Sequence, residues 1–481
     1  MTKPLNELTI TEAASGLRAG DFSVRELWDA CHAVASERNA ELNAYLELFD
    51  ADDVRIAAAQ TRIDSEKENA PLLCGIPLAI KDNILIEGHI ASAASKMLEN
   101  YKAPYSAFVI EKLTDAGALF LGRTNMDEFA MGSSTEHSAY GTVKNPHDVS
   151  RVPGGSSGGS AVAVATNGAI ASLGTDTGGS IRQPAAHCGL VGLKPTYGAV
   201  SRSGAISLGS SLDQIGPFGK TVADAKALFD AIKGEDPKDL TSISADEYSN
   251  SPTSTAGKVL RIGVPRDLLK EGIDADVTEA FEATLARLTE EGHTLVDISL
   301  PTSSYALPMY YVIMPAEAST NLARYDGIRY GLARRGETPL DDYLESKTEG
   351  FGEETKRRIL LGTYVLSSGY IDAYYRKAEA ARDVLREEYR TAFESCDVIA
   401  FPTTPSPAFK FGEKSDPVAM YLEDVFTVTA NLTGMPAISV PMGTVVREES
   451  TLPIGIHFTA PHGAEELLFK IGAEVTGEKL Y

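Results

Sequence analysis

The sequence predicts an α/β fold with a mixed sheet, because short apolar runs typical of buried strands alternate with segments of helical periodicity. The clearest example is a β-α-β unit in which strand-like runs at 260–264 and 294–298 enclose an amphipathic helix over 277–291. The chain has 481 residues, of which 43% are hydrophobic, so it is long enough to bury a large core. It contains neither internal repeats nor low-complexity tracts.

Helices are predicted to form the first layer of the chain, over residues 1–65. Two capping boxes support this prediction, Thr9 with Glu12 and Ser23 with Glu26, and each comes directly before an apolar spacing typical of a helix. In such a box the two side chains satisfy backbone N–H groups that the first helical turn leaves free.

The best candidate for a buried strand is the apolar run 73–80, L-C-G-I-P-L-A-I. It ends abruptly at K-D-N (81–83), as a buried strand does where it reaches the edge of a sheet. Lys81 is therefore predicted to lie at the end of a strand. Residues 106–122 are predicted to contain a helix followed by a second strand at 118–121.

Residues 132–160 are rich in Gly, Ser, Asn and Pro and are predicted to form a long irregular segment. Loops of this length inside a compact domain are usually functional, because their backbone polar groups need unusual partners. The small apolar residues that follow, 161–173, predict a helix that is buried on all sides.

The second half of the chain continues the α/β pattern. A polar stretch at 235–258 is interpreted as a surface excursion and not as a domain boundary. A long helical stretch at 369–395 leads into a strand at 397–401, and short strands are predicted at 437–440 and 454–458.

The charge of the chain argues against direct binding of nucleic acid. It carries 44 Lys and Arg against 67 Asp and Glu, which gives a net charge of −23. Such a surface repels phosphate backbones, whose binding depends on Lys and Arg displacing counterions. If a nucleic acid takes part in the function, a partner protein is expected to hold it.

The cysteines and the N-terminus favour a cytoplasmic protein. The N-terminal residues lack the apolar stretch of a signal peptide, and no run approaches about 18 consecutive apolar residues. Neither secretion by the usual route nor a membrane span is expected. Four widely spaced cysteines form no C-x-x-C pair and are predicted to be reduced, buried thiols: Cys31, Cys74, Cys188 and Cys396.

The densest chemical pattern is a pair of loops that place serines beside glycines, G-G-S-S-G-G-S (154–160) and D-T-G-G-S-I-R (176–182). Glycine permits positive φ and close backbone approach, so such loops can direct several N–H groups at one point. An oxyanion site needs this arrangement. A flexible linker would explain one such loop, but two loops on either side of a buried apolar helix argue against it.

Two familiar motifs fail in the first loop. A phosphate-binding P-loop would need lysine where Ser160 stands. The spacing G-x-S-x-G at 154–158 matches a nucleophile elbow, but an elbow must follow a buried strand. The preceding segment is turn-rich and broken by Pro146 and Pro153, which argues against the elbow.

A serine nucleophile needs a base, and the residues alone leave its identity open. Ser180 is predicted near the start of a short helix, where free N–H groups suit an oxyanion, although this residue taken alone favours the common role of a helix N-cap. His137 and His187 are candidate bases, but neither sits in a diagnostic pattern. Lys81 is the other candidate: burial would lower its pKa enough for it to act as a base, whereas a solvated strand end is the ordinary alternative.

Taken together, three motifs strongly resemble the amidase signature family. They are G-I-P-L-A-I-K-D-N (75–83), P-G-G-S-S-G-G-S-A (153–161) and D-T-G-G-S-I-R-Q-P-A (176–185). The resemblance implies a large twisted mixed β-sheet covered by helices on both faces. It also implies a single amidase domain over 1–481. Within it, a signature core occupies 70–220, and 259–481 supplies the rest of the sheet and substrate-binding residues.

By the same resemblance, Ser180 is the nucleophile, Lys81 the general base and Ser156 the serine that relays protons between them. Ser156 would follow a non-proline cis peptide bond. No metal or organic cofactor is implied in this chain. The oxyanion hole would consist of the backbone N–H groups of Thr177, Gly178, Gly179 and Ser180.

Three further segments are similar to the family members that serve as glutaminase subunits of tRNA-dependent amidotransferases. They are 122–136, E-A-S-T-N-L-A-R-Y-D-G-I-R-Y-G (317–331) and 356–370. In those proteins ammonia from glutamine passes to a tRNA-binding, kinase-like B subunit, which uses ATP and Mg²⁺ on charged tRNA, and a small C subunit completes a heterotrimer. Free glutamine would be held by Tyr310, Arg358 and Asp424, with Arg358 on its α-carboxylate and Asp424 on its α-ammonium.

Two rival functions remain at this stage. A stand-alone amidase for a small or fatty amide would use the same three catalytic residues, and a catalytically dead scaffold would keep the fold alone. All three catalytic positions are filled, which weakens the second rival. One departure from the family pattern, Met314-Pro315, lies close to Tyr310.

Overall fold

An eleven-stranded mixed sheet runs through the molecule in the computed structural model, which describes residues 3–249 and 259–479. Its strands lie in the order β1-β3-β2-β4-β6-β5-β10-β11-β9-β7-β8. The parallel pairs are β2 with β3 and β4, and β7 with β8 and β9, and the other neighbours are antiparallel. The strands are β1 (Tyr45–Leu48), β2 (Pro77–Lys81), β3 (Leu119–Thr124), β4 (Ala171–Asp176), β5 (Val191–Lys194), β6 (Gln214–Gly219), β7 (Arg261–Val264), β8 (Thr294–Asp297), β9 (Val398–Pro402), β10 (Ala437–Arg447) and β11 (Ser450–Thr459).

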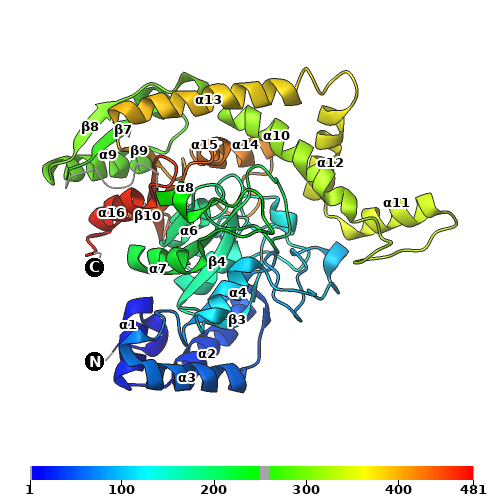
Figure 1. Cartoon of the computed structure of the whole chain (residues 1–481). Helices are drawn as coiled ribbons and strands as arrows, with labels where there is room; N and C mark the ends of the chain where they lie inside the picture. Colours follow the sequence, from blue (N-terminus) through cyan, green and yellow to red (C-terminus); the bar gives the residue numbers. More distant parts are fainter. Residues whose placement is uncertain (1–2, 250–258, 480–481) are drawn as a thin grey trace.

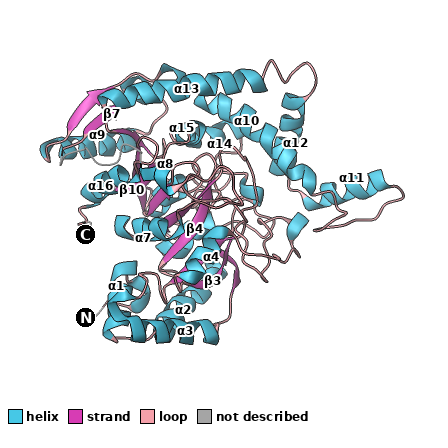
Figure 2. Cartoon of the chain, viewed as in Figure 1, coloured by secondary structure: helices cyan, strands magenta, loops and turns pink. Residues whose placement is uncertain are grey.

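Helices surround this sheet (Figure 2), so the predicted α/β class with a mixed sheet is confirmed. In Figure 1, α1 to α3 gather at one end of the molecule, α13 runs along the opposite end, and α11 projects away from the body. No helix within the described part of the chain is both long enough and apolar enough to cross a membrane. The helices are α1 (Ile10–Ala19), α2 (Val24–Leu42), α3 (Asp53–Glu66), α4 (Phe108–Asp115), α5 (Gly158–Ala165), α6 (Arg182–Cys188), α7 (Val222–Ile232), α8 (Ala245–Ser249), α9 (Ala275–Glu290), α10 (Ala306–Asn321), α11 (Pro339–Gly350), α12 (Glu353–Leu366), α13 (Tyr375–Ser395), α14 (Pro417–Tyr421), α15 (Val428–Thr433) and α16 (Glu465–Thr476).

The N-terminal layer is helical, as predicted, with one strand that was not expected. Both capping boxes form at the starts of α1 and α2, where the serine or threonine and the glutamate bond each other's backbone N–H groups. Residues 45–48 correct the purely helical prediction, because β1 pairs in antiparallel with the edge of β3. Four residues without a clear alternation carry too little periodicity to indicate a strand.

The predicted buried helix over 161–173 is wrong in its second half. The helix α5 ends at Ala165, and Ala171 already belongs to β4. Between them the chain turns at Asn167, which has a positive φ of 59° and is followed by Gly168. Asn-Gly is a turn former, and a short apolar run such as 171–173 cannot be told from a helical segment by composition.

The other predicted elements are largely confirmed. The unit β7-α9-β8 forms a parallel pair with its helix between the strands in sequence, and β9, β10 and β11 coincide with predicted strands. The last two are longer than expected because they form a continuous antiparallel hairpin. The predicted helix at 369–395 begins only at Tyr375. Of the predicted excursion at 235–258, residues 250–258 lie outside the described part, and the rest contains the short helix α8.

The strands β2 and β4 position the candidate site. Every residue of both strands is buried, which explains their continuous apolar sequences. They lie side by side in parallel with Ile80 opposite Leu173, so both carboxyl ends reach the same edge of the sheet. Lys81 is the last residue of β2, and the glycine-rich turn 177–180 follows β4 directly. Parallel α/β sheets typically place their ligand sites at this edge.

Two apolar clusters support this edge. The larger one surrounds the sheet, and the smaller one joins α10, α13 and α15 and includes Tyr310 and Val428. All four cysteines are buried and unpaired, as predicted. Burial raises the pKa of Cys31 to about 12, so that thiol stays protonated.

Candidate active site

Lys81 lies in a fully buried cage of hydroxyl groups. Its Nζ is 2.8 Å from Ser156 Oγ, 2.8 Å from Ser157 Oγ and 2.8 Å from Thr175 Oγ1. A weaker contact of 3.5 Å reaches the Thr175 carbonyl. The side chain has no exposed surface and no ion-pair partner among the described residues. The strand end predicted for Lys81 is therefore buried, and the alternative of a solvated lysine is wrong.

Burial lowers the pKa of Lys81 to about 7, because removal from water disfavours the ammonium form. The nearby carboxylates of Asp127, Asp176 and Asp213 oppose this shift without cancelling it. An appreciable share of Lys81 is therefore neutral at physiological pH. A neutral amine carries a lone pair and can accept a proton from a hydroxyl group.

The hydrogen bonds around Lys81 distinguish Ser156 from its neighbour Ser157. The Ser157 hydroxyl donates to the Thr175 carbonyl at 3.1 Å and accepts from the Thr175 N–H at 3.3 Å. Thr175 Oγ1 also accepts from Asn83 at 3.1 Å. The hydroxyls of Ser157 and Thr175 are thus held by further hydrogen bonds. The Ser156 hydroxyl, in contrast, has no partner besides Lys81 in the described part of the chain. Its proton is free to move.

Ser156 is presented by the irregular segment that leads into α5. The peptide bond Gly155–Ser156 is cis, as the resemblance implied. Asp127, which no sequence motif singled out, orders this segment. Its carboxylate accepts the N–H groups of Thr135 at 2.8 Å and His137 at 3.0 Å, and its own N–H donates to the Ser156 carbonyl at 3.2 Å.

Ser180 lies just before α6 and is 8% exposed. The alternative of a simple helix cap is wrong, since the N-cap residue is Ile181 and no side chain caps this helix. The Ser180 carbonyl accepts the Ser157 N–H at 3.3 Å, which joins the two serine-bearing loops. No hydrogen bond joins the Ser180 and Ser156 hydroxyls in the described residues. Catalytic hydrogen bonds often tighten only when substrate binds.

The turn 177–180 offers three free backbone donors. The N–H groups of Thr177, Gly178 and Ser180 have no partner in the described residues, whereas the Gly179 N–H donates to Asp176 Oδ1 at 2.9 Å. The predicted four-donor oxyanion hole is corrected in this respect, because the Gly179 donor is already engaged.

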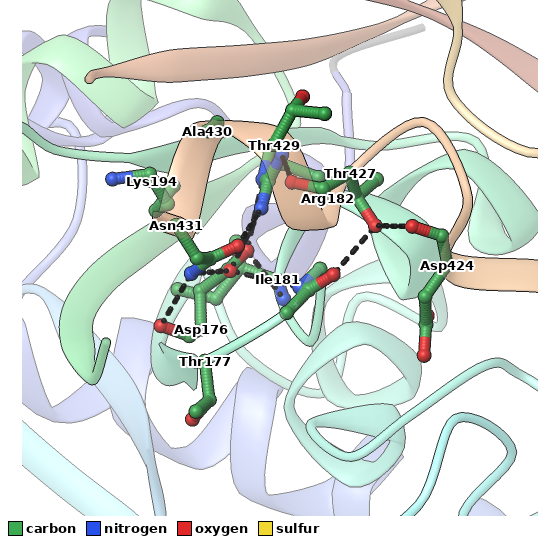
Figure 3. Close-up of polar contacts among 12 residues, drawn as sticks. Asp176, Thr177, Ile181, Arg182, Lys194, Asp424, Thr427, Thr429, Ala430 and Asn431 are labelled. Carbon is green, nitrogen blue, oxygen red and sulfur yellow. Dashed lines mark hydrogen bonds and ion pairs between the residues drawn. The ribbon is translucent and has the colours of Figure 1, made fainter. Parts of the chain in front are cut away.

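A buried ion pair holds this turn (Figure 3). Arg182 grips Asp176 through two hydrogen bonds of 3.0 and 2.9 Å, and neither side chain has exposed surface. Asn431 donates to Asp176 Oδ1 at 2.9 Å. Burial opposes ionisation, but Arg182 and Asn431 outweigh it and hold the pKa of Asp176 well below its usual range. The Thr177 hydroxyl is fixed separately, by Asp213 Oδ1 at 2.7 Å.

Replacing Arg182 with methionine should destabilise the protein by about 3 to 5 kcal/mol, because it leaves Asp176 buried without its counter-charge. The midpoint of thermal or urea unfolding measures the effect. Arg390→Met is the matched control, since Arg390 pairs with Glu387 and Glu394 on the surface and should leave the midpoint unchanged. Equal, small effects of the two substitutions would contradict a structural role for the buried pair.

Tyr310 lies in α10 with its ring against the glycine-rich turn. A Cβ atom added at Gly178 would meet the Tyr310 hydroxyl oxygen at 2.7 Å, so this ring packs directly on the candidate oxyanion hole. Pro315 lies within α10 without ending it, and Tyr310 remains buried. The helix α12 packs closely at this point, because Gly362 leaves room for the Pro315 carbonyl.

Arg358 lies in α12 and is buried beside the stacked rings of Tyr311 and Tyr421, whose centroids are each 5.4 Å from its guanidinium carbon. Its Nε donates to Glu354 at 2.7 Å, and Nη1 contacts the sulfur of Met314 at 3.8 Å. Burial opposes its charge, but Tyr311 and Glu354 outweigh burial and raise the pKa of Arg358. Nη2 has no partner among the described residues and remains available for a ligand oxygen.

Asp424 ends the short helix Leu422–Asp424 and is buried. Burial raises its pKa to about 7, although Ser133, which donates a 2.5 Å hydrogen bond, and Arg358 both favour the ionised form. A ligand with a positive charge would restore ionisation fully. The charge of Arg358 acts on Asp424, since it lowers the pKa of that carboxyl against the effect of burial.

Neither candidate histidine serves the serines. His187 is fully buried in α6 with its ring against Phe409, and burial lowers its pKa to about 4. His137 contributes its backbone N–H to Asp127. Within the described residues, neither ring forms a hydrogen bond with the hydroxyl of Ser156 or Ser180.

The fold and this site together define a class of protein. The family model described as Amidase matches residues 26–469, so the chain belongs to the amidase family. This finding confirms the resemblance seen in the three motifs.

Individual relatives narrow the class. The chain is 50% identical over 471 residues to the A subunit of glutamyl-tRNA(Gln) amidotransferase from Acidobacterium capsulatum, covering 97% of this chain and 98% of the relative. It is 48% identical to the protein of the same name from Koribacter versatilis, with 98% of each chain covered. The crystal structure of the corresponding A subunit from Thermotoga maritima has a TM-score of 0.80 at 37% identity, covering 100% of this chain and 97% of that one. A peptide amidase from Stenotrophomonas maltophilia has a TM-score of 0.81 at 28% identity, covering 99% and 98%.

Proposed function

We propose that this chain is the glutaminase subunit of a glutamyl-tRNA(Gln) amidotransferase, which hydrolyses glutamine and supplies ammonia to a partner protein. The observation that carries the chemistry is the buried Lys81, whose only close partners in the described residues are the hydroxyls of Ser156, Ser157 and Thr175. A lysine held in this way has no structural ion pair to serve, and its pKa of about 7 suits a general base.

The reaction begins when neutral Lys81 takes the proton of Ser156, which in turn takes the proton of Ser180. Ser180 Oγ attacks the side-chain carbonyl carbon of glutamine, and the oxyanion is stabilised by the free N–H groups of Thr177, Gly178 and Ser180. The proton returns through Ser156 to the amide nitrogen, the C–N bond breaks and ammonia leaves. Water then hydrolyses the γ-glutamyl ester by the same proton path and releases glutamate.

Recognition of glutamine rests on two opposite charges. Arg358 binds the α-carboxylate through its free Nη2 donors, and Asp424 binds the α-ammonium. Tyr310 lies beside Gly178 and positions the side-chain amide over the turn. A plain amide lacks both charges, so this pair selects an amino acid.

The remaining steps take place outside this chain. A tRNA-binding, kinase-like B subunit uses ATP and Mg²⁺ to activate the side-chain carboxylate of Glu-tRNA(Gln), with Asp-tRNA(Asn) as an alternative substrate, and ammonia converts it to the amide. A small C subunit completes a cytoplasmic heterotrimer. The net charge of −23 agrees with tRNA being held by the partner.

The main rival, a stand-alone amidase, predicts a different substrate profile. Ammonia release should be measured for glutamine and for a panel of amides such as acetamide, benzamide and a fatty amide, with the chain alone and with its partner proteins. A strong preference for glutamine is expected. Vigorous hydrolysis of unrelated amides without that preference would favour the rival.

Asp424→Asn should raise the KM for glutamine roughly 10- to 100-fold, because a charged hydrogen bond contributes about 1.5 to 3 kcal/mol. Steady-state ammonia release measures KM. Glutaric acid monoamide, which lacks the α-ammonium, is the control substrate and should be hydrolysed equally well by wild type and variant. An equal loss with both substrates would show that Asp424 does not read the ammonium group.

A further inference from the structure

The peptide plane between Gly178 and Gly179 is held at both of its polar ends. Its carbonyl accepts a hydrogen bond of 2.6 Å from Thr427 Oγ1, and its N–H donates to Asp176 Oδ1 at 2.9 Å. Figure 3 shows Thr427 and Asp176 approaching the turn from opposite sides. Thr427 is fully buried, so water does not compete for either bond.

This plane sets the direction of the donors on either side of it. The N–H of Gly178 belongs to the preceding peptide and that of Ser180 to the following one, and both are candidate oxyanion donors. Glycines rotate freely, and Gly179 has a φ of 139°, so nothing in their own side chains fixes these planes. A rotation here would turn both donors away from the reacting carbonyl.

Thr427 belongs to a closed ring of buried contacts. Its backbone carbonyl accepts from Arg182 Nη1 at 2.8 Å, and Arg182 grips the same Asp176 that holds the Gly179 N–H. The approach is so close that a Cβ atom at Gly179 would lie 2.3 Å from Thr427 Oγ1. Thr427 is therefore held at two points: its backbone carbonyl accepts from Arg182, and its hydroxyl group donates to the Gly178 carbonyl.

The single proton of the Thr427 hydroxyl has two carbonyl neighbours. Gly178 O lies at 2.6 Å and Asp424 O at 3.1 Å, and the Asp424 carbonyl already accepts the Thr427 N–H at 3.0 Å. The contact with Gly178 O is the shorter one, and this carbonyl accepts no other hydrogen bond in the described residues. The hydroxyl proton is therefore expected to point to Gly178 O.

We propose that Thr427 is a positioning residue for this reaction: its hydroxyl locks the Gly178–Gly179 peptide so that the neighbouring N–H groups face the oxyanion. The inference rests on the proposed glutaminase function. It assigns a catalytic consequence to a side chain that lies far from Ser180 in the sequence and touches no reacting atom.

The test compares Thr427→Val, which keeps the shape and removes the donor, with Thr427→Ser, which keeps the donor. In the assembled enzyme, the valine variant should lower the kcat of glutamine hydrolysis roughly 10- to 100-fold with KM within about threefold, and the serine variant should stay within about threefold of wild type. Deleting an oxyanion donor outright costs about 10²- to 10³-fold, so an indirect effect should be smaller. Amide formation from added ammonium chloride bypasses the site and should be normal, which shows that the variant folds and assembles.

Each other outcome decides against the proposal. An unchanged kcat in Thr427→Val would remove the positioning role, and a rise in KM alone would place the effect on the Asp424 segment instead. Equal damage in the valine and serine variants would assign the role to the methyl packing. If Thr427→Val fails to assemble, Thr427→Ala replaces it in the comparison with serine. Wild-type enzyme without glutaminase activity would instead overturn the proposed function itself.

Discussion

Replacing Ser180 with alanine should lower ammonia release from glutamine by roughly 10⁴-fold or more, because Ser180 is the proposed nucleophile and no acyl-enzyme can form without it. Folding should be unaffected, since the Ser180 hydroxyl forms no hydrogen bond in the described part of the chain. The variant should still assemble with its partners and use added ammonium chloride for amide formation. Ammonia release and the ammonia-dependent reaction, measured on the same preparation, separate the two effects.

A matched control is Ser172→Ala in the neighbouring strand β4. The Ser172 side chain is fully buried and bonds only the Ser160 carbonyl, at 2.8 Å, among the described residues. Its loss tests whether any buried serine near the site is needed, and activity should remain. Normal turnover in Ser180→Ala would remove this residue from the nucleophile role and shift attention to Ser156, which Lys81 contacts directly.

The second large effect concerns Lys81 and pH. In the proposed mechanism only the neutral amine of Lys81 accepts the proton of Ser156, and burial lowers the pKa of Lys81 to about 7. The kcat for glutamine should therefore rise about tenfold per pH unit below pH 7 and level off above it. Lys81→Arg keeps the charge but cannot be deprotonated, so kcat should fall roughly 10²- to 10⁴-fold at every pH tested.

Two control variants test whether the pH dependence of kcat arises from Lys81. Lys194 is a second fully buried lysine whose pKa burial also lowers to about 7, but its Nζ bonds only the Pro195 carbonyl within the described chain. In Lys194→Met, kcat should still rise with pH below pH 7, which is the acid limb of the profile. Asp424 also titrates near pH 7 in the free protein, so Asp424→Asn should alter kcat/KM while the limb of kcat persists. A limb that disappears in either variant would contradict the assignment to Lys81.

The elements that place the candidate catalytic residues could be predicted because these elements arise from local sequence. A strand buried on both faces has a continuous apolar sequence, and the sequence changes to polar where β2 ends. The position of Lys81 at the end of a strand could therefore be predicted. The capping boxes of α1 and α2 are equally local. In contrast, β5 and β6 were not predicted, because glycine and proline weaken the strand pattern of four- and six-residue segments that gain their stability from neighbours.

The contacts that shape the turn could not be predicted, because they join distant parts of the chain. Thr427 bonds Gly178 across 249 residues of sequence, and Asn431 bonds Asp176 across 255. No spacing in the sequence marks such pairs. The engagement of the Gly179 N–H by Asp176 is likewise a tertiary contact, although aspartate at the head of D-T-G-G-S is a residue type that often binds nearby backbone N–H groups.

The identity of the nucleophile is tested most directly by locating the covalent intermediate. The assembled enzyme should be mixed with isotope-labelled glutamine, quenched with acid during turnover and digested for peptide mass spectrometry. A γ-glutamyl ester on Ser180, absent from Ser180→Ala, is the predicted result. The same ester on Ser156 or Ser157 would contradict the central claim that Lys81 and Ser156 serve Ser180 as the nucleophile.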